Sequence, residues 1–252
     1  MTKKQNQAQS KINHKWDKAV EVWNESSNFI FFKMKTMIHN LSTGKSILNK
    51  YLYEMRSVDK QRDSMRFRIN MERMGELMAY EISKHLNYQS STVETPLGEA
   101  YVELPTDQIV LASILRAGLP LHQGFLRIFD DVENGFISAY RSHHKDGSFD
   151  IKLEYITCPN IDGKVLILLD PMLATGASIH KTLEHLEDYG KPSQLHVVSV
   201  IASSQGVKHV QRFFPNAQIW TGAIDEELTA KSYIVPGLGD AGDLCFGIKL
   251  QE

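Results

Sequence analysis

The chain has 252 residues, which is enough for one large domain or for one domain with an appendage. Hydrophobic residues make up 42% of the sequence, so a sizeable core can form. Charged residues make up 23% and the net charge is −2, which does not indicate a strongly basic surface for nucleic acid.

The first 45 residues are predicted to be an N-terminal extension. Residues 1–20 are polar and show little periodicity, as is typical of a disordered or loosely held segment. Alternatively, Met34 or Met37 could be the natural start, and the residues upstream of it would then not belong to the natural protein. The N-terminal residues are too polar for the apolar core of a secretory signal, and the sequence shows no apolar run near the ~20 residues that span a bilayer. We therefore expect a cytoplasmic protein with no membrane partner.

Residues 46–252 are predicted to form the main domain, which begins with two helices at 46–56 and 64–86. The second helix carries apolar residues at helical spacing, which gives it one apolar face. These residues are Phe67, Met71, Met74, Met78 and Ile82. A methionine-rich face of this kind is typical of a core or of a subunit interface. Next, residues 92–103 contain Pro96, Leu97 and Gly98 between two β-prone pieces, which predicts a hairpin.

Strands and helices then alternate. Five strands are predicted at residues 108–114, 135–141, 165–169, 195–202 and 217–221, and three helices at 119–129, 178–189 and 206–214. The third strand is a run of aliphatic residues, as expected for a parallel strand buried on both faces. The alternation predicts an α/β fold, with a parallel sheet of about five strands flanked by helices.

Residues 149–155 break this alternation, because apolar and charged residues alternate with a period of two. Together with the strand at 135–141, they predict a β-hairpin arm off the main sheet. The polar residues 142–148 would form its turn.

Residues 170–178 have the composition of a phosphate-binding turn. They follow the most buried strand and open a helix, where free N–H groups and a partial positive charge favour an anion. Ala174, Gly176 and Ala177 are small enough for a phosphate to approach the backbone, and Asp170 could hold ribose hydroxyls or a metal-bound water. The alternative is an ordinary turn with Ser178 as the helix N-cap.

Three segments together resemble the uracil phosphoribosyltransferase family of type I phosphoribosyltransferases. DPMLATGAS (residues 170–178, the phosphate loop) is similar to the loop that binds the donor, phosphoribosyl diphosphate (PRPP). SILRAGL (residues 113–119, the pyrophosphate loop) and YIVPGLGDAGD (residues 233–243, the base loop) resemble the pyrophosphate-binding and uracil-binding segments. The resemblance runs from about residue 46 to residue 249 in the family's order.

The resemblance implies the conversion of uracil and PRPP to UMP and pyrophosphate in UMP salvage, with Arg116 and Asp240 as catalytic residues. The implied PRPP-binding residues are Arg116, Arg141, Asp170, Pro171, Met172, Leu173, Ala174, Thr175, Gly176, Ala177, Ser178 and Asp240. The implied uracil-binding residues are Ile234, Gly239, Asp240 and Ala241. Mg²⁺ would be held through PRPP and water, without a direct protein ligand. A homodimer or larger homo-oligomer is expected, and GTP is a candidate effector.

Two other functions stay open on the sequence alone. The first is a phosphoribosyltransferase for another base, such as a purine. The second is a non-enzymatic regulator that senses nucleotides or binds RNA, although the nearly neutral charge argues against RNA. The chain also departs from the family pattern at Ala177, where glycine is common, at Pro120 and at residues 244–247. We expect Ala177 to be helical, because a left-handed conformation would cost it about 1–2 kcal/mol.

Overall fold

The structure, a computed structural model, describes residues 38–143 and 149–249, with only the backbone given at 139–143 and 149–153. The chain divides into two compact units, residues 1–37 and 38–252, and the described residues belong to the second. The predictions for residues 1–37 and for the centre of the 142–148 turn therefore fall outside the described residues.

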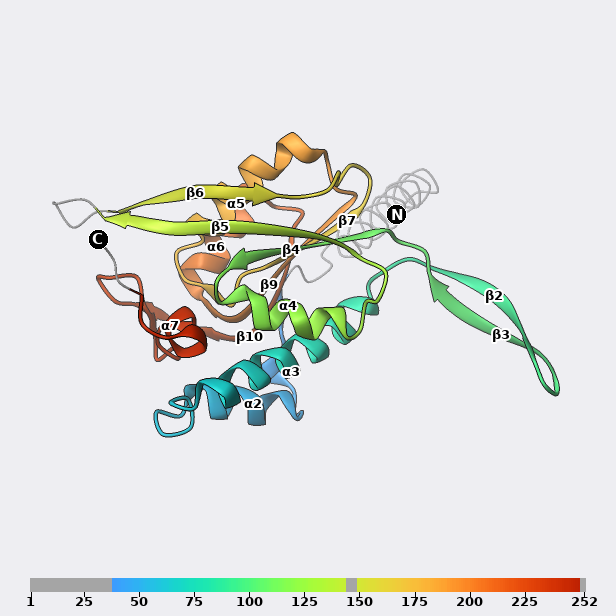
Figure 1. Cartoon of the computed structure of the whole chain (residues 1–252), viewed down its shortest axis with the longest axis horizontal. Coiled ribbons are helices and arrows are strands. Elements are labelled where there is room, and N and C mark those ends of the chain that lie inside the picture. The colour runs from blue at the N-terminus through green and yellow to red at the C-terminus, as the bar shows by residue number, and fades with distance from the viewer. Residues whose placement is uncertain (1–37, 144–148, 250–252) are drawn as a thin grey trace, which may run out of the picture. The chain divides into compact units, whose positions relative to one another are not determined.

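The predicted parallel sheet is confirmed (Figure 1). Its strands lie in the order β1 (Ile38–Asn40), β10 (Gln218–Asp225), β9 (Gln194–Ser203), β7 (Val165–Leu169), β4 (Ile109–Leu115), β5 (Glu133–His143) and β6 (Phe149–Thr157), and the short β8 (Met172–Leu173) also pairs with β9. Only β6 runs antiparallel to its neighbour. Strand β1 pairs with β10 in the register Ile38↔Ile219, so residues of the predicted extension take part in the sheet.

Helices cover both faces of the sheet (Figure 1). One face carries α2 (Leu48–Arg56), α3 (Ser64–Ser83) and α4 (Gly118–Leu126), and the other carries α5 (Ala177–Leu186) and α6 (Ser204–Phe213). Two short 3₁₀ helices, η1 (Leu41–Thr43) and η2 (Glu187–Tyr189), follow β1 and α5. The described helices include none that is long and apolar enough to cross a bilayer.

Alternation along the central strands divides the core into two layers. On β7, Val165, Ile167 and Leu169 pack with α2, α3 and α4, whereas Leu166 and Leu168 pack with α5 and α6. Such strands must be apolar throughout, because they are buried on both faces.

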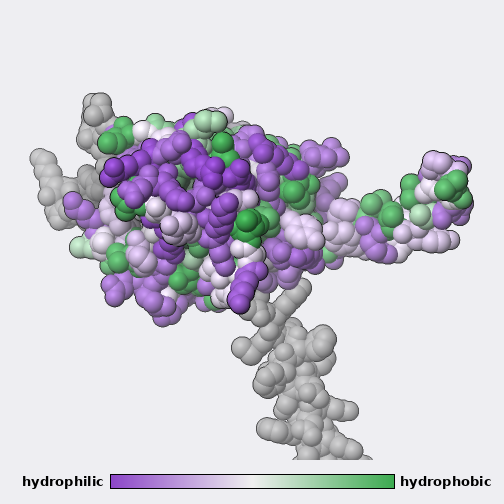
Figure 2. Space-filling model, turned by 90° about the horizontal axis from the view of Figure 1, so that it is seen from below, coloured by the Kyte–Doolittle hydropathy of each residue, from purple (hydrophilic) through white to green (hydrophobic). Residues whose placement is uncertain are grey.

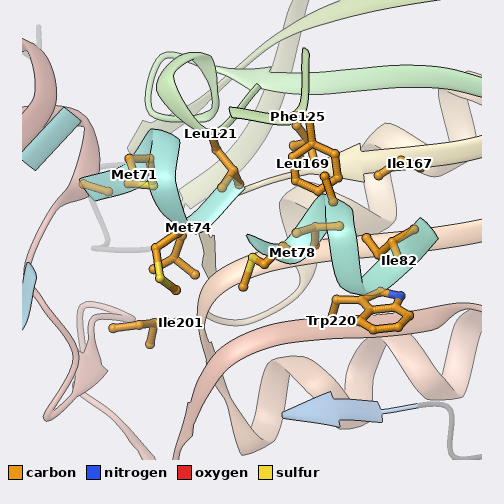
Figure 3. Close-up of a cluster of buried hydrophobic side chains, with 14 of the residues drawn as sticks. Met71, Met74, Met78, Ile82, Leu121, Phe125, Ile167, Leu169, Ile201 and Trp220 are labelled. Carbon is orange, nitrogen blue, oxygen red and sulfur yellow. The ribbon is translucent and has the colours of Figure 1, made fainter. Parts of the chain in front are cut away.

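The methionine-rich face of α3 belongs to the first of these layers. Met71, Met74 and Met78 are fully buried and pack among Leu121, Phe125 and Trp220, as Figure 3 shows. The core interpretation of this face is therefore confirmed. The face supplies no subunit interface, so it no longer supports the expected oligomer.

Two hairpins extend the fold. The predicted pairing of residues 135–141 with 149–155 is confirmed as β5 and β6, which form one edge of the main sheet. The predicted hairpin at 92–103 is longer than expected, with β2 (Tyr88–Thr95) and β3 (Gly98–Pro105) in a sheet of their own. It projects from the main sheet (Figure 1), and Figure 2 shows hydrophobic side chains along it. Leu97 is 99% exposed and Tyr101 is 80% exposed.

Candidate functional site

The phosphate loop leaves the sheet at the end of β7. The main-chain N–H of Asp170 still donates to Val198 O (3.0 Å), and its carboxylate accepts from the N–H of Met172 (3.2 Å). The residues that line a small hollow here are Asp170, Met172, Leu173, Ala174, Thr175, Gly176, Ser178 and Ile179. The hollow is open at the start of α5, where helical N–H groups lack partners within the helix.

Gly176 sets the conformation of this turn. It has φ 83° and caps α5 in the left-handed region, which glycine enters without strain. Ala177 is the first helical residue, and its N–H donates to the hydroxyl oxygen of Thr175 (3.3 Å). The expectation that Ala177 is helical is confirmed. The alternative of Ser178 as the N-cap is wrong, because the helix begins one residue before it.

Helix α6 packs directly against the phosphate loop. The Ser203 hydroxyl donates to Ala174 O and accepts from the N–H of Gly206 (2.8 Å). A Cβ atom at Gly206 would lie 2.4 Å from Ala174 O and 2.7 Å from Leu173 O. Only a residue without a side chain lets α6 approach this closely, so the helix fixes the position of the loop backbone at Leu173 and Ala174.

The pyrophosphate loop leaves the sheet beside the phosphate loop, because β4 pairs directly with β7 in the register Ser113↔Leu169. Its Arg116 follows a cis Leu115–Arg116 peptide and is 43% exposed. The guanidinium Nη2 lies 3.3 Å from Asp243 Oδ1 and 3.4 Å from Gly247 O. Helix α4 follows, and its third residue, Pro120, needs no N–H donor in the first turn, so this departure is tolerated.

The base loop is held in an irregular shape between two short elements. It starts in β12 (Ile234–Val235), which pairs with β11 (Glu227–Leu228), and ends in α7 (Ala241–Phe246). Between them lie a cis Val235–Pro236 peptide and two left-handed glycines, Gly237 (φ 58°) and Gly239 (φ 95°). The predicted glycine-rich loop is therefore neither helix nor strand over residues 236–240.

Asp240 caps α7 at its N-terminus. Its Oδ1 accepts from the N–H of Asp243 (3.0 Å), and its Oδ2 lies 3.0 Å from Nζ of Lys249. Burial raises the pKa of the Asp240 carboxyl, but the Asp243 N–H and the Lys249 ammonium lower it more, so the pKa lies below its ordinary value. Asp240 is therefore a carboxylate at neutral pH.

The pyrophosphate and base loops converge although 127 residues separate Arg116 from Asp243. A Cβ atom at Gly242 would lie 3.7 Å from Arg116 Nη2 and 3.2 Å from Asp240 Oδ1. The phosphate loop leaves the adjacent strand, so all three loops open at the carboxyl edge of the parallel sheet. Arg141 lies in β5, but its side chain is not described, and its role stays a prediction.

Several residues at this edge were not predicted. Arg56 and Asp225 contact Gly237 in the base loop, Lys249 contacts Asp240, and Arg68 Nη1 donates to Cys245 O of α7 (2.6 Å). Arg56, Asp225 and Lys249 are single charged residues without a local motif, and no signal in the sequence distinguishes them from surface charges. Cys245 itself is buried, and burial raises the pKa of its thiol to about 12.

The chain is similar to several known proteins over most of its length. A family model described as uracil phosphoribosyltransferase matches residues 42–248. A uracil phosphoribosyltransferase of Porphyromonas gingivalis is 53% identical over 85% of this chain and 99% of its own. One from Methanothermobacter thermautotrophicus is 43% identical over 73% of this chain and 85% of its own. Among solved structures, the AQ2163 protein of Aquifex aeolicus superposes with a TM-score of 0.75 at 28% identity, over 85% of this chain and all of the other.

Proposed function

Because the chain belongs to the uracil phosphoribosyltransferase family, we propose that it transfers the phosphoribosyl group of PRPP to uracil, giving UMP and pyrophosphate in UMP salvage. The convergence of Arg116 with the base loop carries this proposal. It brings a cation suited to pyrophosphate within 4 Å of the segment suited to the base.

The donor would bind across two loops. The N–H groups of the phosphate loop and the hydroxyls of Thr175 and Ser178 would hold the 5-phosphate at the start of α5. Asp170 would accept from the ribose hydroxyls. Arg116 would exchange its contacts to Asp243 and Gly247 for the pyrophosphate oxygens, which a guanidinium can bind with two N–H groups.

The base would be read by backbone groups. Uracil presents acceptors at O2 and O4 and a donor at N3–H, so a carbonyl and an N–H in the base loop match its edge. We assign this to Ile234, Gly239 and Ala241, and the N–H of Ala241, at the first position of α7, has no partner within the helix. Cytosine reverses part of the pattern, which would leave buried groups unpaired at roughly 1–3 kcal/mol each.

In the proposed reaction, the bond between ribose C1 and pyrophosphate breaks as the bond from C1 to uracil N1 forms. Pyrophosphate leaves with the bonding electron pair, and the proton of N1 passes to water. Positive charge develops on the ribose, and negative charge on the leaving pyrophosphate. Arg116 would stabilise the leaving group, and Asp240 would orient the donor or its bound water. None of the described side chains at this edge is placed as a covalent nucleophile.

Mg²⁺ is the expected cofactor, and the oxygen donors near the site fit it. Carboxylates are ligands that Mg²⁺ accepts, and Asp170 and Asp240 supply them at two of the three loops. Among the side chains that the structure describes, no three from acidic, histidine or cysteine residues are arranged around one metal position. We propose that the two aspartates act through water, while the metal neutralises charge on the diphosphate.

The direct test is a mixture of protein, Mg²⁺, PRPP and labelled uracil, followed by separation of UMP. We expect UMP and an equal amount of pyrophosphate. Absence of UMP above background would contradict the enzyme assignment, and a reaction with hypoxanthine or adenine in place of uracil would contradict the base assignment.

We also propose a homodimer or larger homo-oligomer in the cytoplasm. The support within the described structure is the projecting β2–β3 hairpin, whose exposed Leu97 and Tyr101 would be covered by a second copy. Sedimentation tests this, and a monomer would remove the proposal. GTP as an effector rests on the family resemblance alone, and an assay of UMP formation with and without GTP tests it.

A further inference from the structure

Arg56 and Asp225 form an ion pair that binds one residue of the base loop, Gly237, and is called the clamp below. Nη1 and Nη2 of Arg56, the last residue of α2, lie 2.7 Å from the two carboxylate oxygens of Asp225, the last residue of β10. The same pair binds both backbone groups of Gly237. Nη1 of Arg56 donates to Gly237 O (3.0 Å), and the N–H of Gly237 donates to Asp225 Oδ2 (2.8 Å).

The base loop turns back on itself at Gly237. A Cβ atom there would lie 2.1 Å from Ile234 O, and its φ of 58° is left-handed. The next residue, Leu238, lies beside the Gln61 amide. With this amide oriented so that its nitrogen faces the two carbonyl oxygens, Gln61 would donate to Leu238 O (2.7 Å) and Met55 O (3.0 Å). The end of α2 and the segment after it therefore fix the middle of the base loop.

The pair and the loop depend on each other. The Asp225 side chain is 7% exposed, and the described hydrogen bonds to it come from Arg56 and Gly237. A buried carboxylate that loses a donor is strongly disfavoured. Movement of Gly237 would remove one of its three hydrogen bonds, so the ion pair is fully satisfied only when the loop has this conformation.

We propose that Arg56 and Asp225 are positioning residues that preorganise the base loop for uracil, an inference that rests on the proposed function. Ile234 precedes Gly237 by three residues and Ala241 follows it by four, so the clamp sits between the groups assigned to the base. Small displacements of such groups weaken recognition strongly. The clamp has no described contact with the phosphate loop, so its loss should affect the binding of uracil more than that of PRPP.

A second ion pair on the same helix supplies a matched control. Glu54 of α2 accepts two N–H groups from Arg66 of α3, at 2.8 and 3.0 Å, and neither residue has a described hydrogen bond to the base loop. Arg56→Lys and Arg66→Lys therefore make the same chemical change, one at the clamp and one away from it. Thermal melting of both variants reports how far each loses stability.

For Arg56→Lys we expect the KM for uracil to rise about tenfold or more, and the KM for PRPP to rise by a clearly smaller factor, because only Asp240 of the base loop would face the donor. Arg66→Lys should leave both KM values at the wild-type level, even where its Tm falls as much. Equal KM values for uracil in the two variants, or a parallel rise for both substrates, would overturn the proposal.

Asp225→Asn provides a second variant should Arg56→Lys fail to fold, because it keeps the side-chain shape and removes the charge. It should show the same selective rise in the KM for uracil, and an unchanged value would count against the proposal. Wild-type protein that makes no UMP would refute the proposed function itself and the inference with it. Wild-type activity with unaltered variants would refute the inference alone.

Discussion

The Lys249 ammonium contacts two carboxylates at the N-terminus of α7. It lies 3.0 Å from Oδ2 of the N-cap residue Asp240 and 3.6 Å from Oδ1 of Asp243 in the first turn. Arg116 contacts the same Asp243 at 3.3 Å, so two cations and two carboxylates form one cluster at the mouth of the site. The cluster leaves Asp240 charged, and it holds Arg116 beside the base loop.

Asp240→Asn should reduce turnover far more than it reduces stability. The variant keeps an oxygen that can accept from the Asp243 N–H and cap α7, but it loses the charge that would orient the donor or its water. We expect kcat to fall at least about tenfold, with a Tm within a few degrees of wild type. Steady-state kinetics with melting curves provide the measurement, and normal activity in a folded variant would refute the role.

Lys249→Ala should shift the acid limb of the pH–rate profile upward. The ammonium favours the Asp240 carboxylate, so its removal raises the pKa of Asp240 toward the ordinary range. The Asp243 N–H still donates to Asp240, so the group should remain ionised at neutral pH. Measurement of kcat from about pH 7 down to about pH 3, as far as melting curves show the variant folded, gives the shift, and superimposable profiles would show that Lys249 does not tune this carboxyl.

Arg116→Ala should chiefly weaken use of the donor. Loss of charge-assisted hydrogen bonds to pyrophosphate should lower kcat/KM for PRPP about 10- to 100-fold. Arg127→Ala is the control, because Arg127 also pairs with acids, Glu72 and Glu76, but has no described contact with the three loops. That variant should keep wild-type kinetics, and Arg116→Ala with unchanged donor kinetics would contradict the assignment.

Gly206→Ala should displace the phosphate loop away from α6. The added methyl would meet Ala174 O at 2.4 Å, which outweighs the usual benefit of alanine in a helix. We expect a loss of about 1–3 kcal/mol in stability and a higher KM for PRPP. Gly44→Ala is the matched control, since its methyl would meet no atom within 4 Å. Equal effects of the two substitutions would show that the close approach of α6 does not hold the loop.

Glu54→Gln should destabilise the protein at neutral pH but not in acid. Hydrogen bonds from Arg66 and Asn70 lower the pKa of Glu54 from 4.5 to about 2. A lowered folded-state pKa stabilises the protein above about pH 4.5, and this contribution is lost as the pH falls toward 2. Because Arg66 is 44% exposed, we expect about 1–2 kcal/mol. Urea unfolding from pH 2 to pH 7 tests whether the difference from wild type disappears in acid.

The sheet was predictable from its long aliphatic strands, because burial on both faces leaves continuous apolar runs. Strands β1 and β8 were missed, since three and two residues are too few for a pattern and pair only because β10 and β9 offer free edges. The predicted end of α3 at residue 86 was three residues too far. Beyond Ser83 the chain continues in tighter turns, with His85 N–H donating to Ile82 O.

The site was predictable where glycines and small residues gather in one segment, as in the three loops. It was not predictable at Arg56 and Asp225, whose meeting depends on tertiary contact across 169 residues. The same holds for the hairpin β2–β3, whose polar start at Gln89, Ser90 and Ser91 hides its full length. Local composition identifies which loops bind, while long-range packing determines what holds them.

The junction of Arg116 with Asp243 joins segments made early and late in translation. During synthesis, residues 113–119 leave the ribosome well before residues 233–249. The pyrophosphate loop is therefore made before the segment that Arg116 contacts. A nascent chain that ends before residue 233 contains all the described strands of the main sheet but lacks the base loop. The ability to bind the base would therefore be acquired late, when residues 233–249 dock beside Arg116.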